Sequence, residues 1–230
     1  MEESVARELK SLSRHFPKWA DTMRKHEEQI YQTDVEEVSD DAVQTELEVH
    51  EICRTILGVC TRCGHFRDTW DPGTLMQFPF GQQTTMKSQK TGAEIALGCS
   101  HRDIFLSSYL NSPEHIKSMT DEFWACFIEL QSLGDFRFLE NALPSSQEAH
   151  RIMKHSKNAK SNIFQIIRNY LLLEACQQGS DDLGSLEIKW PSTMPWSEMI
   201  ENAVKAFGRL HKINYLLYRG EYIRRKGRQP

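Results

Sequence analysis

The chain has 230 residues, of which 39% are hydrophobic and 26% are charged, and its formal net charge is -4 at pH 7. This composition excludes the fibrous and the fully disordered classes and is typical of a globular protein with one compact body. The negative net charge argues against a uniformly basic nucleic-acid-binding protein. No secretory leader and no apolar run of membrane-spanning length is recognisable, so we expect a soluble intracellular protein, cytoplasmic or nuclear, with reduced cysteines.

Residues 1–58 predict N-terminal helices. The first of them are thinly apolar and look peripheral. Asp34 and Glu37 resemble a capping box, which predicts the start of a further helix. Apolar residues then recur at helical spacing, and we expect this helix to end at about Gly58.

Residues 59–110 predict a small antiparallel β element. The segment Trp70-Asp71-Pro72-Gly73 is typical of a turn. Pro79 is expected at a sheet edge or a strand end, because proline cannot donate a ladder hydrogen bond. The strand-like segments lie at 74–80, 84–89 and 93–99.

Residues 111–221 predict a C-terminal helical bundle, followed by a basic tail at 222–230. Ser112 and Pro113 suit the start of an amphipathic helix that Gly134 ends. The segment 161–177 is apolar nearly all round, which predicts a central, buried helix. The other expected elements are a short helix up to about His155, a strand at 185–190 and a long helix at 196–218.

Taken together, these elements predict an α+β fold that is mainly helical. We expect a helical bundle and a small antiparallel β element that carries a zinc site. The zinc site is the most informative feature, because no other stretch of the chain has a sharp chemical signature.

The zinc prediction rests on the sequence GVCTRCGHF at 58–66. A Cys-x2-Cys turn brings two thiolates to one point, and a following glycine relieves the tight backbone. Cys60, Cys63 and Gly64 fit this pattern, and Cys99 with His101 would supply the second half of a tetrahedral site. His65, His50 and Cys53 are alternative ligands.

Two other interpretations of the cysteine pair stay open. A redox dithiol prefers a helix N-terminus that follows a strand, whereas this pair follows a predicted helix. Packed core cysteines need no partner at all. With four protein ligands a zinc ion would be structural, because it would have no open position for a substrate or water.

Basic residues gather near the predicted zinc loop and at the C-terminus. Such clusters suit contacts with phosphate groups or with an acidic protein partner, although a basic tail is also a common solubilising feature. The candidate contact residues are Arg62, Arg67, Arg102, Arg224, Arg225, Lys226 and Arg228.

Glu187-Ile188-Lys189 lies in a predicted strand and follows Asp181 and Asp182, which superficially resembles the Glu-x-Lys of metal-dependent nucleases. The tripeptide is common, and an alternating surface strand predicts the same residues. No phosphate-binding glycine loop or nucleophile elbow is present.

The sequence therefore favours a non-enzymatic, zinc-stabilised binding or regulatory protein that acts through protein–protein contacts. The regions around Trp70, Trp124 and Trp196 could form an exposed apolar patch, which would suit an interface, although these tryptophans could also simply cover the core. Nucleic-acid binding is the alternative, and a metal-dependent nuclease is a distant third.

Overall fold

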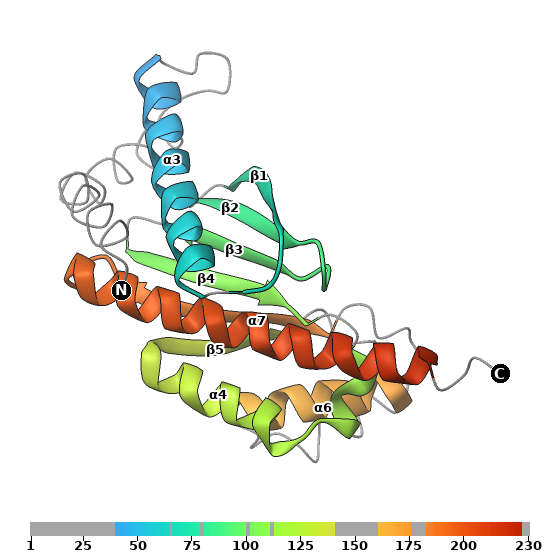
Figure 1. The fold of residues 1–230 in the computed structure, drawn as a ribbon. Coiled ribbons are helices and arrows are strands. Elements are labelled where there is room, and N and C mark those ends of the chain that lie inside the picture. Colours follow the sequence, from blue (N-terminus) through green and yellow to red (C-terminus); the bar gives the residue numbers. More distant parts are fainter. Residues whose placement is uncertain are drawn as a thin grey trace.

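A six-stranded antiparallel sheet is the framework of the computed structural model, which describes residues 40–64, 66–78, 81–99, 102–110, 113–140, 161–175 and 183–226. The strand order is β1-β2-β3-β4-β6-β5, and every neighbouring pair is antiparallel (Figure 1). The strands are β1 (Trp70–Phe78), β2 (Gly81–Ser88), β3 (Glu94–Cys99), β4 (Asp103–Tyr109), β5 (Asp135–Glu140) and β6 (Gly184–Pro191).

Helices cover one face of this sheet and its β5 edge. The helices α3 (Asp40–Cys63) and α7 (Trp196–Lys226) lie across the same face, in front of the sheet in Figure 1. The helix α4 (Asp121–Leu133) packs against α7 and β5. The helix α6 (Asn162–Ala175) lies beside β5 and the short 3-10 helix η1 (Pro113–Ser118).

Alternation along the strands creates the core. In β4, Ile104 and Leu106 are fully buried, whereas Tyr109 on the opposite face is 56% exposed. Directly paired residues of neighbouring strands share a face, so β3, β6 and β5 present their own apolar side chains to the helices. These core residues are Ile95, Leu97, Leu186, Ile188, Trp190, Phe136 and Phe138.

Polar contacts fix the helices against the sheet and one another. Asn214 of α7 is fully buried and donates through Nδ2 to Ser108 Oγ of β4 at 3.0 Å. Trp190 Nε1 of β6 donates to the carbonyl of Leu133 at the end of α4 at 2.7 Å. On the surface, Lys212 of α7 pairs with Glu122 of α4 at 2.8 Å. Burial of the apolar faces supplies the driving force, and these bonds select one arrangement of the helices.

The predicted fold class, a helical bundle with a small β element carrying a zinc site, is wrong. The sheet joins strands from 59–110 with β5 and β6, which lie in the segment predicted to be a bundle. The strands β4 and β5 were not recognised because their outward positions carry charged and hydroxyl side chains among short apolar runs. The described residues also contain no group of three His, Cys, Asp or Glu side chains placed to hold a metal.

Several predicted elements differ in their bounds. The helix expected to end near Gly58 continues to Cys63. The turn expected at 70–73 lies inside β1, where the register shifts between Pro72 and Leu75. A β-bulge on an edge strand accommodates the proline that a central strand would exclude. The predicted strand at 185–190 and the predicted helix beginning at 196 are confirmed.

Some predictions lie outside the described residues, including the helices before residue 40, the short helix near His155 and Pro79. Within the described part, no helix has both the length and the apolar character needed to cross a lipid bilayer.

Candidate functional site

The cysteine pair lies on the last turn of α3 and not in a turn after it. Cys60 is fully buried in the core, and Cys63 is partly buried and packs against that core. The amide of Gly64 donates to the Cys60 carbonyl at 3.1 Å and ends the helix. A Cβ at Gly64 would overlap the ring of Phe66, so the glycine is needed for the close approach of this ring.

Burial and the neighbouring Cys63 raise the pKa of the Cys60 thiol, which favours the neutral thiol over the thiolate that zinc requires. Cys99 ends β3 and is fully buried in the same core. His101 and His65 lie outside the described residues, so the ligand set Cys60, Cys63, Cys99 and His101 stays a prediction. Zinc that is bound by the wild type and by Cys126→Ser, but lost from Cys60→Ser and Cys99→Ser, would establish it. Wild-type protein without zinc would remove it.

Two of the alternative ligands have other contacts. His50 Nδ1 lies 2.9 Å from Thr84 Oγ1, where it joins α3 to β2. Cys53 is 1% exposed and belongs to the core cluster. Both side chains therefore have structural roles in holding α3 to the sheet.

The candidate basic contact residues fall in separate places along the chain. Arg62 lies in the last turn of α3, Arg67 lies in the loop that follows, and Arg102 precedes β4; all three are exposed. The side chains of Arg224, Arg225, Lys226 and Arg228 lie outside the described part. Nucleic-acid binding by these residues stays a prediction.

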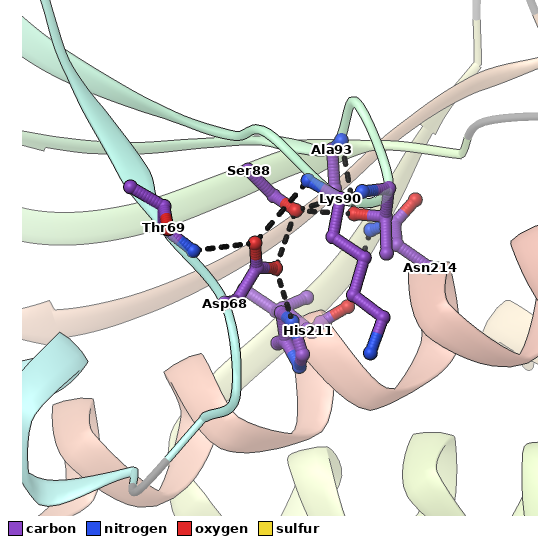
Figure 2. Close-up of polar contacts among 9 residues, drawn as sticks. Asp68, Thr69, Ser88, Lys90, Ala93, His211 and Asn214 are labelled. Carbon is purple, nitrogen blue, oxygen red and sulfur yellow. Dashed lines mark hydrogen bonds and ion pairs between the residues drawn. The ribbon is translucent and has the colours of Figure 1, made fainter.

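The strongest polar cluster in the described structure centres on Asp68, in the loop between α3 and β1 (Figure 2). Its Oδ2 accepts the hydroxyl of Ser88 at 2.5 Å and lies 3.2 Å from His211 Nε2. Its Oδ1 accepts the amides of Thr69 at 2.8 Å and Lys90 at 3.2 Å. The carboxylate, whose side chain is 1% exposed, thus links a loop, the β2–β3 turn and α7.

A serine, a histidine and an aspartate together raise the question of nucleophilic catalysis. In a catalytic triad the imidazole stands between the hydroxyl and the carboxylate and takes the proton of the serine. Here the carboxylate stands in the middle, and the hydroxyl of Ser88 donates to Asp68. Ser88 is fully buried and also accepts the amide and the hydroxyl of Thr91. This arrangement suits a structural hydrogen-bond network and not an acyl-transfer site. We call the network of Asp68, Ser88 and His211 the clip.

The pKa values of the clip reflect opposing effects. Burial alone would raise the pKa of the Asp68 carboxyl, but the hydrogen bonds from Ser88, His211 and the two amides outweigh it and hold the pKa below its usual range. Burial lowers the pKa of His211, which packs 4.3 Å from the Phe66 ring and 5.4 Å from the Trp70 ring. The folded protein therefore favours a neutral His211 beside an ionised Asp68.

The lowered pKa of His211 predicts a stability that falls in mild acid. The unfolded imidazole binds a proton near pH 6.5, whereas the folded one resists it, so the free energy of unfolding decreases as the pH falls below about 6.5. Asp68 opposes this effect and Lys90 adds to it. Urea unfolding at about pH 7.5 and about pH 5.5 measures the change. His211→Gln, which cannot gain a proton, should have a smaller change, and an equal change would contradict the prediction.

The Glu-x-Lys motif lies on the sheet face away from the helices. Glu187 Oε1 and Lys189 Nζ form an ion pair of 3.0 Å, and the Lys189 ammonium lies 5.8 Å from the centre of the Phe105 ring. The two charges thus pair with each other across one position of β6. Asp181 and Asp182 lie outside the described residues, so the nuclease alternative stays untested.

An exposed apolar stripe on α6 is the clearest candidate for a contact surface. Phe164 is 63% exposed and Leu171 is 49% exposed, and the partly buried Ile167 lies between them on the same side of the helix. The opposite side, with Ile166 and Leu172, is fully buried. This helix was predicted to be central and buried; it lies instead at the sheet edge with one apolar side uncovered.

Sequence reasoning missed the clip because its members are far apart in the chain. Asp68 and His211 are separated by 143 positions, and nothing in either local segment marks the contact. The Ser-x-x-Thr-Gly turn at 88–92 was visible as a break between strands, but its hydroxyls gave no sign of their partner. Pairing of this kind is decided by the fold.

The comparisons with known proteins give no further assignment. No protein-family model matches the chain, and searches of curated proteins and of solved structures find no significant similarity.

Proposed function

We propose that this protein is a non-enzymatic binding or regulatory protein that acts through protein–protein contacts, and that the α6 stripe of Phe164, Ile167 and Leu171 is a contact surface. The observation that carries the proposal is the exposure of Phe164 and Leu171 on one side of a helix whose other side is buried. Single exposed apolar residues are common, but adjacent ones along a helix face are typical of an interface.

The structure of the stripe suits a preformed interface. α6 is held at both ends by contacts to the rest of the fold: Asn162 Nδ2 donates to the Phe136 carbonyl at 2.9 Å, and Lys117 pairs with Glu174 at 3.0 Å. Asn162 Oδ1 also accepts the amide of Phe138 at 3.0 Å, which satisfies part of the β5 edge. A helix fixed in this way presents apolar side chains with little further ordering cost on binding.

The test is affinity capture from a cell lysate with the 230-residue chain immobilised. We expect the double variant Phe164→Asp/Leu171→Asp to capture at least about tenfold less of a specific partner than the wild type does. Burial of each apolar side chain contributes about 1.5–3 kcal/mol to the free energy of binding. The matched control is Ile128→Asp, since Ile128 is an equally exposed apolar residue, 60% exposed, on a different helix, α4. Circular dichroism establishes that both proteins are folded.

Raising the salt concentration separates the alternatives. An apolar interface should keep its partner at about 0.5 M salt, whereas nucleic-acid contact should weaken steeply. Equal capture by the double variant and the wild type would contradict the proposal. Salt-sensitive capture that is lost in Arg62→Gln/Arg67→Gln would instead support nucleic-acid binding.

A further inference from the structure

The two edges of the sheet differ in how easily a further strand could pair with them. At the β1 edge, Pro72 cannot donate a ladder hydrogen bond, and the register shifts between Pro72 and Leu75. At the other edge, β5 contains no proline and pairs with β6 without a break in register. A straight edge strand is a template for pairing with another strand, so the β5 edge requires protection of a different kind.

The side chain of Asn162 binds the backbone of β5 on the side away from β6. Asn162 Nδ2 donates to the Phe136 carbonyl at 2.9 Å, and Asn162 Oδ1 accepts the Phe138 amide at 3.0 Å. One residue of a parallel neighbouring strand would make the same two bonds, because its N–H and C=O reach the residues on either side of the one opposite. The Asn162 amide thus occupies the pairing position opposite Arg137.

Asn162 is not required to cap its own helix. Ser161 precedes α6; its carbonyl accepts the amide of Gln165 at 3.0 Å, and its hydroxyl accepts the amide of Phe164 at 3.4 Å. These are the bonds of an N-cap residue, so the Asn162 side chain is available for β5. The backbone of α6 cannot satisfy the strand in the same way, because the amides and carbonyls inside a helix bond to one another.

We infer that α6 closes the β5 edge and that the Asn162 amide is the group that blocks strand addition there. A second contact holds the helix further along, where Arg168 pairs with Glu140 at the end of β5. This role is separate from that of the α6 stripe, because Asn162 and Arg168 contact β5 whereas Phe164 and Leu171 are exposed.

Removal of the amide should open this edge. In Asn162→Ala, the Phe136 carbonyl and the Phe138 amide lose their partner, and the first turn of α6 loses its link to β5. In a purified sample, the strand available for pairing is the β5 edge of another copy of the chain. We therefore expect Asn162→Ala to self-associate at least about tenfold more tightly than the wild type, as measured by sedimentation. A variant that stays as monomeric as the wild type at the highest concentration reached would overturn the inference.

Asn214→Ala is the matched control. Asn214 also links a helix to a strand, but it donates to Ser108 Oγ on β4, which lies inside the sheet and not at an edge. Asn214 is fully buried, so the same substitution there should destabilise the fold at least as much without opening an edge. Urea unfolding compares the stability of the two variants. Equal self-association of both would show that association follows the loss of stability, and this too would overturn the inference.

Amide hydrogen exchange shows whether β5 is the strand that pairs. In the wild type, the Phe138 amide should be protected at every protein concentration. In Asn162→Ala it should exchange at least about tenfold faster in dilute protein, and a higher concentration should restore its protection as a second strand binds. Self-association that leaves this amide unprotected would place the contact elsewhere and would overturn the inference. An unprotected Phe138 amide in the wild type would do so as well, a result that needs no variant to fold.

Discussion

Asp68→Asn should cost about 3 kcal/mol of the free energy of unfolding, because an amide has one acceptor oxygen and cannot accept both from Ser88 and His211 at Oδ2 and from the backbone amides of Thr69 and Lys90 at Oδ1. Ser88 and His211 are at least nine-tenths buried, and the new NH2 group would face either these two side chains or the two backbone amides, as a donor against donors. The loss also removes the link between the α3–β1 loop and α7. Urea unfolding followed by tryptophan fluorescence measures the change, since Trp70 lies beside His211.

The chain offers a close control for this substitution. Asp71 lies three residues further on, is exposed and accepts a hydrogen bond from Gln89 at 2.6 Å. Asp71→Asn makes the same chemical change at the surface and should cost less than about 0.5 kcal/mol. Similar losses for the two variants would mean that Asp68 is not the centre of a buried network.

Gly184→Ala should cost at least about 3 kcal/mol, the second large effect expected in this fold. Gly184 starts β6 with φ of 133°, a conformation that side chains rarely adopt. Its Cβ would lie 2.8 Å from the Phe138 ring and closer still to the Leu139 carbonyl, both on β5. The added methyl group would therefore strain the backbone and push β5 away from β6.

Gly92→Ala is the control that separates the cost of backbone strain from the cost of side-chain crowding, which Gly184→Ala combines. Gly92 has φ of 70° in the β2–β3 turn, and a Cβ there would meet no atom within 4 Å. Gly92→Ala should lower the free energy of unfolding by about 1–2 kcal/mol, which is the cost of the left-handed conformation alone. Thermal unfolding of both variants gives the comparison, and a larger loss for Gly92→Ala would contradict the argument about β5.

The cysteine motif shows that a local pattern can predict which residues are neighbours without predicting the secondary structure in which they lie. A spacing of three residues places Cys60 and Cys63 close together in either a turn or a helix. It does not reveal that α3 continues through both residues, because Gly58 in the middle of an otherwise apolar stretch resembles a helix end. Tertiary packing of Ile56, Leu57 and Val59 stabilises the helix enough to carry it past that glycine.

The helix α6 shows a second limit of the pattern. Apolar residues all round a helix predict a buried position, and the sequence contained this signal. The fold places α6 at the sheet edge, where Ile166 and Leu172 are covered and Phe164 and Leu171 are not. A sequence records how much apolar surface a helix has, but not which part of it the rest of the chain will cover.

The sequence by itself determined the features that depend on neighbouring residues: the strands near 84–88 and 94–99, the strand at 185–190 and the helix that begins at Trp196. Side-chain periodicity and turn residues act within a few positions, so they can be read locally. Only the tertiary structure decided that β4 pairs with β6, that Asp68 meets His211 and Ser88, and that one side of α6 stays uncovered. These features join distant segments, and they follow from the packing of the whole core and not from any local preference.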